Sequence, residues 1–321
     1  MRAAVCSQHG PPEVVRVQEC PEPSAGPGQV VVRVAAAAVN YPDVLLLADS
    51  YQVSVAPPFV PGSEFAGVVD ETGPGVTDFA IGDRVSGAGM TGAFAQRVCV
   101  DAAALTRIPD TVDAHTAAAF GVAHRTAYHT LRSVGRLSAG DQLVVLGAGG
   151  GVGLAAVQLG AALGADVTAV ASCDEKLAVA RRYGAARSIN HRSNDLRTAL
   201  RETLPRAADV VVDPVGGALS EPALRSLGRG GRFVTVGFAS GVIPRIPLNL
   251  VLLKGIQVLG FQFLDIAADE FTRNEAELRN LLVSGRIAPH VGAMYSLDDT
   301  AAALRHVGDG RAIGKVLIDL S

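Results

Sequence analysis

A cluster of glycines lies between two hydrophobic stretches in the middle of the chain. Residues 143–153 read LVVLGAGGGVG, an apolar strand that enters a glycine-rich turn and is followed by an apolar helical stretch. Such glycines let a phosphate approach the backbone and let the helix pack closely on the strand, while the first amides of the helix point at the anion. A second strand at 166–171 completes the spacing of a strand-helix-strand unit. The pattern predicts a pyrophosphate-binding turn with contacts from Gly150, Gly151, Val152 and Gly153. A tight turn without a ligand is the alternative.

The end of the second strand distinguishes two dinucleotides. NAD sites usually place Asp or Glu there to bind the ribose 2′-hydroxyl, whereas Ser172 offers no carboxylate. Lys176, and Arg192 further along the chain, could meet a 2′-phosphate with positive charge. We therefore predict NADPH as the cofactor, with Ser172 and Lys176 among its contacts. The alternative is that Lys176 belongs to a solvated helix face and that Asp174 or Glu175 takes the acidic role.

The elements around this turn divide the chain into two parts. Short strands separated by proline- and glycine-rich turns are expected at 14–17, 30–39, 66–70 and 94–100. The pattern changes near Pro109-Asp110, and residues 113–134 form an alanine-rich helical stretch. From Asp141 strands and helices alternate, and the strands are continuous apolar runs, which is typical of a parallel sheet covered on both faces.

The last strand of the chain, 314–318, has no partner in the middle part by order, so we expect it to return to the N-terminal β-domain. A helical stretch is expected around 271–283. The predicted domains are residues 1–118, completed by 264–321, and a central domain of residues 119–263.

Composition excludes several classes of partner. The formal net charge is −3, which provides no basic surplus for nucleic acid or anionic lipid. Residues 143–165 are long enough and apolar enough to span a membrane, but the glycine cluster inside them favours a strand, a turn and a buried helix. The cysteines stand far apart and no targeting signal is evident, which favours the cytoplasm. They are Cys6, Cys20, Cys99 and Cys173.

The whole chain resembles the medium-chain dehydrogenase/reductase superfamily, and within it the quinone oxidoreductase (zeta-crystallin-like) group. The matching segments occur in the same order along this chain and along members of that group. They are VNYPD at 39–43, Tyr51, PGSEFAG at 61–67, GDRV at 82–85, the glycine turn, DPVGG at 213–217, GFASG at 237–241 and GKV at 314–316. The resemblance implies an α/β fold: a Rossmann domain with a doubly wound parallel sheet, plus a GroES-like β-domain. It also implies a homodimer joined through sheet edges, with residues 256–260 as the edge strand.

The resemblance weakens at the positions of metal ligands. Zinc-dependent alcohol dehydrogenases of the same superfamily place a Cys where this chain has Asn40, and a His-Glu pair where it has Ser63-Glu64. The cysteine cluster of their structural zinc lobe is missing as well. A zinc centre needs about four converging ligands, and no convincing set is present. We therefore expect no metal.

Four candidate catalytic residues follow from the resemblance. Asn40 and Thr126 would border the nicotinamide, while Asp43 and Tyr51 would line the substrate cleft. Asn40 would orient the carboxamide or donate to a substrate oxygen, and the Tyr51 hydroxyl would donate to that oxygen. A general acid is not identifiable. Without the resemblance, Asn40 and Asp43 are better interpreted as caps of a helix that begins near Pro42. Tyr51 would then be an ordinary loop aromatic, and Thr126 a helix-surface hydroxyl.

Other candidate cofactor contacts are less specific. His191 lies where family members often have a tyrosine near the adenosine phosphate, and on its own it is more typical of a surface loop. Phe238, Ala239 and Ser240 follow a strand of the central domain, where a loop can close over a ligand or form a plain turn. Lys315 resembles a cofactor-contacting terminal lysine, with an exposed charge as the alternative.

The activity that fits best is NADPH-dependent hydride transfer to a quinone, because the developing oxyanion is stabilised by resonance and positioning is the main task. The nearest alternative is reduction of an activated double bond in an enal, enone or enoyl thioester. A third, from another class, is a non-catalytic NADPH-binding protein with a structural or regulatory role. The expected partner in the first two cases is a small electrophile.

Overall fold

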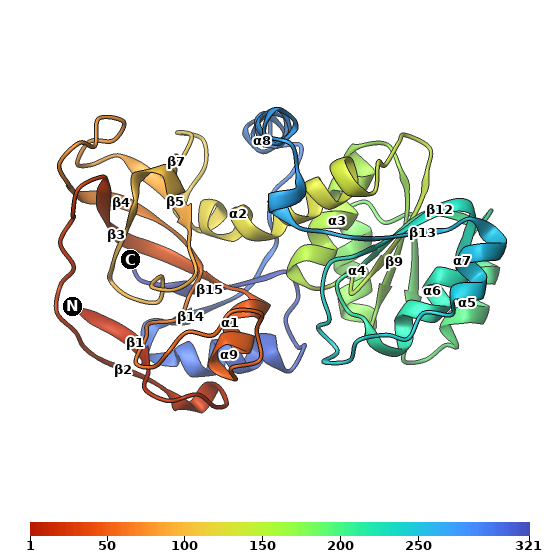
Figure 1. Ribbon diagram of the computed structural model, residues 1–321, viewed down its shortest axis with the longest axis horizontal. Helices are drawn as coiled ribbons and strands as arrows, with labels where there is room; N and C mark the ends of the chain where they lie inside the picture. Colours follow the sequence, from red (N-terminus) through yellow and green to blue (C-terminus); the bar gives the residue numbers. More distant parts are fainter. The chain divides into compact units, whose positions relative to one another are not determined.

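Two compact units make up the chain, and the computed structural model describes all of its residues, 1–321 (Figure 1). One unit, which we call the β-unit, contains Met1–Val122 and Pro289–Ser321. The other, the central unit, contains Ala123–Ala288. The first junction falls a few residues after the predicted one, which follows residue 118. The β-unit is built from both ends of the chain, as the sequence predicts.

The second junction differs from the prediction. We predict it after residue 263, whereas the structure places it after Ala288. The segment in between carries helix α8 (Ala268–Val283), which confirms the expected helical stretch. This helix belongs to the central unit because the Tyr128 hydroxyl donates a 2.6 Å hydrogen bond to its Glu277. A contact across so long a separation in sequence leaves no local pattern from which to predict it.

Strands from distant parts of the chain form the main sheet of the β-unit. The strands of this unit are β1 (Arg2–Cys6), β2 (Val15–Glu19), β3 (Gln29–Val39), β4 (Glu64–Thr72), β5 (Arg84–Ala88), β6 (Arg97–Asp101), β7 (Leu105–Arg107), β14 (Val291–Ser296) and β15 (Lys315–Asp319). The order is β14-β15-β3-β4-β5-β7, with β6 also paired to β3 and β1 paired to β2 in a separate sheet. Because β15 lies antiparallel to β3, the predicted return of the last strand is confirmed.

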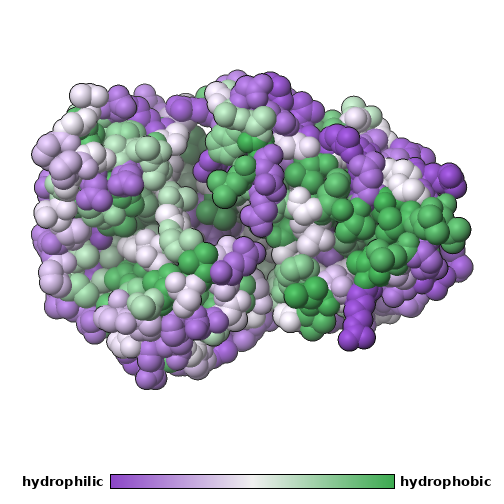
Figure 2. Space-filling model, viewed as in Figure 1, coloured by the Kyte–Doolittle hydropathy of each residue, from purple (hydrophilic) through white to green (hydrophobic).

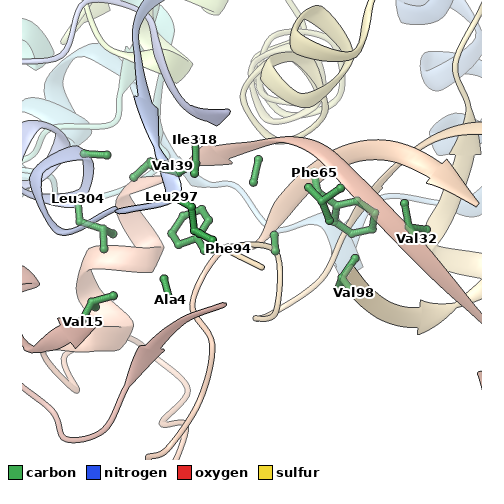
Figure 3. Packing of buried hydrophobic residues seen from close by; sticks show 14 of the residues in the cluster. Ala4, Val15, Val32, Val39, Phe65, Phe94, Val98, Leu297, Leu304 and Ile318 are labelled. Carbon is green, nitrogen blue, oxygen red and sulfur yellow. The ribbon is translucent and has the colours of Figure 1, made fainter. Parts of the chain in front are cut away.

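The core of the β-unit lies against this main sheet. Figure 3 shows Phe65 and Val98 packed near Val32, with Leu304 and Ile318 contributed by the C-terminal segment. The helices of this unit are α1 (Tyr41–Leu47), α9 (Thr300–Gly308) and the first part of α2 (Ala114–His129). Burial of these apolar side chains is the main force that joins the two ends of the chain.

A parallel sheet forms the central unit, as its continuous apolar runs predict. Its strands are β8 (Gln142–Leu146), β9 (Asp166–Ala171), β10 (Arg187–Asn190), β11 (Ala208–Asp213), β12 (Leu227–Thr235) and β13 (Gln257–Gly260). Their order is β10-β9-β8-β11-β12-β13, and every pair is parallel. The predicted edge strand is therefore confirmed, since β13 pairs with β12 alone.

Helices cover both faces of this sheet. They are α3 (Gly151–Ala162), α4 (Asp174–Arg182), α5 (Leu196–Thr203), α6 (Ser220–Ser226) and α7 (Leu248–Lys254). The second part of α2, a π-helical turn at Thr130–Val134 and α8 complete the helices of this unit. Val144 of β8 packs with side chains of α5 and α6. The adjacent Leu143 points to the opposite face, where a side chain at Gly160 of α3 would collide with it. The predicted doubly wound α/β fold is confirmed.

None of the helices combines the length and the apolar character that a membrane span requires. The apolar stretch 143–165 contains β8, the glycine turn and α3, as its glycines predict.

Candidate functional site

The glycine turn joins the buried strand β8 to α3 in the central unit. Gly147 has a positive φ of 60°, and its carbonyl oxygen accepts the N–H of Gly150 at 2.9 Å. Gly150 is the N-cap of α3, and its own carbonyl oxygen accepts the N–H of Leu154 at 2.8 Å. The N–H groups of the first helical turn have no partner within the helix, so this end offers donors and a positive dipole to an anion.

Steric limits explain two of the glycines. A Cβ atom on Gly153 would lie 2.1 Å from the Gly147 carbonyl oxygen, which is backbone and cannot move aside cheaply. A Cβ atom on Gly149 would lie 2.6 Å from the side chain of Lys176. By contrast, nothing lies closer than 3.6 Å to a Cβ atom on Gly150. Gly153 is therefore required by the fold, whereas a Cβ atom on Gly150 would make only an ordinary van der Waals contact with the protein.

Three basic side chains gather where β9 and β10 end. Burial lowers the pKa of Lys176, Cys173 opposes this effect, and Arg192 lowers the pKa further. Burial also lowers the pKa of His191, and the Arg192 guanidinium adds to that shift. Positive charges repel one another within a half-buried cluster. An anion that binds between them stabilises their charged forms. Lys176 also packs on Gly149, so this cluster adjoins the glycine turn.

Two acidic residues, Asp174 and Glu175, lie nearby at the start of α4. Asp174 accepts a 3.0 Å hydrogen bond from the side-chain amide of Asn190, so its carboxylate ties the start of α4 to β10. Glu175 is exposed to solvent. Ser172 follows the last residue of β9, as predicted, and carries no negative charge. The last residue of β9 and the residue after it thus carry no carboxylate.

The loop 237–242 packs on the turn that follows β11. The N–H of Ala239 donates to Pro214 O at 3.1 Å, and the N–H of Ser240 donates to Val215 O at 2.9 Å. Asp213 shapes that turn, because its Oδ1 accepts the N–H of Val215 at 2.8 Å. Phe238 keeps 38% of its surface exposed. The predicted contacts of this loop with a cofactor stay predictions.

A buried cluster of charged and polar groups lies in the β-unit. Lys315, at the start of β15, is 4% exposed, and its ammonium group lies 3.0 Å from Glu64 Oε2. It also donates to Oδ1 of Asn40. Asn40 Nδ2 in turn donates to Glu64 Oε2 at 3.1 Å. The alternative interpretation of Lys315 as a simple exposed charge is wrong, and its predicted contact with the cofactor stays a prediction.

Asp43 stabilises the start of α1. Its Oδ2 accepts the backbone N–H of Asn40 at 2.7 Å, and Asn40 is the N-cap residue, so the capping interpretation is confirmed for this contact. The side chain is fully buried, and Oδ1 has no hydrogen-bonding partner. Burial raises the pKa of Asp43 to about 7, against the lowering effects of the Asn40 N–H, the Ser63 hydroxyl and Lys315. A direct contact between Asp43 and a substrate stays a prediction.

The other two candidate catalytic residues lie apart from this cluster in sequence. Tyr51 is partly exposed on the loop after α1 in the β-unit. Thr126 belongs to the central unit and lies on the second part of α2. It is only 8% exposed, so the alternative interpretation of Thr126 as a helix-surface hydroxyl is wrong. The roles predicted for both stay predictions.

Glu64 was not among the sequence-predicted site residues. It is 1% exposed, and its Oε1 accepts the N–H of Val122 at 2.7 Å. A Cβ atom on Gly121 would lie 2.9 Å from the same oxygen, so the close approach of α2 requires a glycine there. A charged residue in the buried first half of β4, ahead of Phe65 and Ala66, is the signal that could have identified it.

Comparisons with known proteins agree with both units. Residues 26–110 match the model of the alcohol dehydrogenase GroES-like domain, and residues 151–279 match that of zinc-binding dehydrogenase. Quinone oxidoreductase-like protein 2 of Mus musculus is 35% identical over 326 residues, which cover 99% of this chain and 92% of that protein.

Solved structures are similar over the same length. Quinone oxidoreductase of Escherichia coli in complex with NADPH has a TM-score of 0.92 and 28% identity, and covers 99% of this chain and 100% of its own. An NAD-dependent alcohol dehydrogenase has a TM-score of 0.91 and 30% identity, with both chains covered completely. The chain therefore belongs to the quinone oxidoreductase group of the medium-chain dehydrogenase/reductase superfamily.

Proposed function

We propose that the protein is an NADPH-dependent oxidoreductase that transfers hydride to a quinone without a metal. The observation that carries the proposal is the glycine turn with the basic side chains of Lys176, His191 and Arg192 beside it. Together they match a dinucleotide that carries an additional phosphate. Relatives named quinone oxidoreductase, one of them solved with NADPH, support the same conclusion.

The central unit has groups for each charged part of the cofactor. The absence of a side chain at Gly150 and the N-terminus of α3 suit a pyrophosphate, with the amides of Gly151 and Val152 as donors. Lys176 and Arg192 suit the 2′-phosphate, for which charged donors form strong hydrogen bonds. We assign Ser172 and His191 to the adenosine ribose, and the loop of Phe238, Ala239 and Ser240 to the nicotinamide half.

Removal of the Lys176 ammonium group tests this assignment. In the Lys176→Ala variant, the affinity for NADPH is expected to fall by about 10- to 100-fold, the order of one or two charge-assisted hydrogen bonds, while the affinity for NADH stays unchanged. Titration of cofactor fluorescence measures both. Arg182→Ala on the exposed side of the same helix is the control, with no change expected. Equal losses for both cofactors would contradict the assignment.

The β-unit contributes the polar groups that we assign to catalysis. When bound, NADPH supplies the hydride, and a proton from solvent completes the reduction of a quinone to a hydroquinone. Asn40 can donate a hydrogen bond to a ligand oxygen, and the Tyr51 hydroxyl can do the same from its loop. Thr126, which belongs to the central unit, is assigned to the nicotinamide side. Asp43 acts on the site through the backbone of Asn40, which it caps.

The residues of this unit do not fit a catalytic zinc ion, although one matching family model is named for zinc. Nowhere in the chain do three or more His, Cys, Asp or Glu side chains gather as metal ligands. At the buried cluster a cation is already supplied by the protein itself, because the Lys315 ammonium group bonds Asn40 and Glu64. A metal ion beside it would meet charge repulsion and an amide in place of a thiolate.

The substrate class is tested by offering a quinone and an enone separately to the purified protein and following NADPH oxidation optically. Turnover with the quinone and little with the enone is expected. Turnover with the enone alone would replace quinone reduction by double-bond reduction. No turnover with either, despite tight NADPH binding, would favour the non-catalytic class.

A second copy of this chain is the partner that we propose. Edge strand β13 has an unpaired side, and Val258 on it is 44% exposed. Leu248 and Leu252 of the neighbouring α7 are 75% and 83% exposed. Figure 2 shows hydrophobic residues gathered on the surface of the central unit where Figure 1 draws α7. An open strand edge beside exposed apolar residues is typical of an interface, here one that continues the sheet into a homodimer.

A charge at this surface should separate the copies. Leu252→Glu is expected to raise the dissociation constant of the dimer about tenfold or more, because a buried apolar anchor becomes a desolvated charge. Light scattering after size exclusion measures the mass over a dilution series. Ile81→Glu, also at an exposed apolar residue but in the β-unit, is the control. A wild-type protein that is monomeric at every concentration would contradict the proposal.

All four cysteines are unpaired thiols in the structure. Free thiols suit a reducing compartment, and they support the proposal that the protein works in the cytoplasm.

A further inference from the structure

The side-chain amide of Asn40 has two ends that are alike in shape and opposite in hydrogen bonding. Oδ1 accepts, whereas Nδ2 donates through two N–H groups. A rotation by half a turn exchanges the two ends, so only the neighbouring groups decide which orientation is populated.

The neighbours of this amide are a charged pair of opposite sign. The Lys315 ammonium group can only donate, and it bonds Oδ1. The Glu64 carboxylate, paired with that ammonium group at 3.0 Å, accepts from Nδ2 at 3.1 Å. The reversed amide would place NH₂ against the ammonium group and the carbonyl oxygen against the carboxylate, and both contacts would be repulsive. All three side chains are buried, so water does not weaken this preference.

One N–H of Asn40 is left weakly bonded in this orientation. Glu64 takes the first N–H of Nδ2, whereas the other acceptors lie farther away, at 3.4 Å for Ser63 Oγ and 3.5 Å for Ala38 O. Glu64 cannot easily turn away, because its second oxygen is held by the backbone N–H of Val122 at 2.7 Å.

We propose that Lys315 and Glu64 are positioning residues that hold the amide of Asn40 in one orientation, so that its remaining N–H donates to a carbonyl oxygen of the bound ligand. The inference rests on the proposed function. Two carbonyl groups share this chemistry, the carboxamide of the cofactor and the oxygen of the quinone. Both charges favour the same orientation. Lys315 bonds Oδ1, which Glu64 would repel, and Glu64 bonds Nδ2, which Lys315 would repel.

The test removes both charges at once. In Glu64→Gln/Lys315→Met the cluster loses both charges but keeps its approximate volume. The melting temperature should stay near that of the wild type, because replacing a buried ion pair by neutral groups is often neutral for stability. Activity should nevertheless fall about tenfold, the order of one lost hydrogen bond, because the amide is free to turn. A merely structural pair would change the melting temperature and activity together.

Three further variants keep the test decisive. The single variant Lys315→Met leaves the Glu64 charge unpaired and is expected to lower the melting temperature, whereas Lys315→Arg restores a donor for Oδ1 and should recover part of the activity. Glu13→Gln/Arg305→Met neutralises an exposed ion pair of the same unit and should leave activity unchanged.

The ligand oxygen that Asn40 bonds is identified by comparing the dissociation constant for NADPH with kcat/KM for the quinone. A larger dissociation constant for NADPH, measured by fluorescence, assigns the bonded oxygen to the cofactor carboxamide. An unchanged dissociation constant with a lower kcat/KM for the quinone assigns it to the substrate. If the wild type reduces the quinone and the double variant matches it in both constants, the inference is overturned and the proposed function stands. If the wild type reduces neither substrate, the proposed function fails, and an unchanged NADPH constant in the double variant overturns the inference as well.

Discussion

Replacement of Gly153 by alanine is expected to lower both the stability of the central unit and its affinity for NADPH. The added Cβ atom would lie 2.1 Å from the Gly147 carbonyl oxygen and 3.0 Å from Ala148 Cα, so α3 must move away from β8. Overpacking of this kind costs about 1 to 3 kcal/mol, and more where the opposing atoms are backbone. The donors at the helix N-terminus move with α3, so we expect a loss of affinity of about 100-fold or more.

A matched variant separates the fold from the ligand. Gly150→Ala places a Cβ atom no closer than 3.6 Å to any protein atom outside its own neighbours, and its φ of −85° suits alanine. Its urea unfolding curve should therefore match that of the wild type, whereas its NADPH affinity should fall because the methyl group enters the space assigned to the pyrophosphate. Unchanged binding in Gly150→Ala would show that no phosphate approaches this turn.

The stability of the wild type should fall between about pH 4 and pH 7 relative to the Asp43→Asn variant. The folded pKa of Asp43 is about 7, because the carboxyl group is fully buried, whereas an unfolded aspartate titrates near pH 4. Between these values the folded protein keeps a proton that the unfolded chain has lost, so the free energy of unfolding decreases as pH rises. At about 1.4 kcal/mol per pH unit, the full change is about 4 kcal/mol.

Urea unfolding of both proteins at pH 4.5 and pH 8 measures this difference. Asp195→Asn is the control, since Asp195 caps α5 from the exposed surface, and the Thr198 N–H lowers its pKa. Its contribution has the opposite sign: it is present above the unfolded pKa and is lost as pH falls. Parallel pH profiles for the wild type and Asp43→Asn would mean that folding does not raise the pKa of Asp43.

Local signals were enough to predict the glycine turn and the capped helix. The strand of β8, the glycines and α3 follow one another directly, so their chemistry and their geometry can be inferred from one continuous stretch. Asp43 lies three residues after Asn40, the spacing at which a carboxylate reaches the N-cap amide. In both cases the interacting groups are neighbours in sequence.

The charged cluster of the β-unit could not be predicted in the same way. Lys315 meets Asn40 and Glu64 only because β15 inserts beside β3, which in turn pairs with β4. The return of β15 was predicted from the lack of another partner, but its register decides which side chains meet, and no local pattern specifies register between the two ends of a chain. Lys315 therefore looked like an exposed charge when considered alone.

The placement of α8 was missed for a related reason. Its contacts with the end of α2 include those of His129, which stacks on Phe271 at 4.9 Å between ring centroids and bonds Glu275 at 2.9 Å. His129 has no exposed side-chain surface. A polar partner for a buried histidine can come from any element, so the sequence leaves the choice of unit open.

The most direct test of the proposed reaction is NADPH oxidation with a quinone by protein that has been treated with a chelator and shown to be free of metal. The account predicts the same kcat before chelation, after chelation and after addition of zinc, with NADPH preferred over NADH. Loss of turnover on chelation and its recovery with zinc would contradict the metal-free account, and turnover with NADH alone would contradict the assignment of the basic cluster to the 2′-phosphate.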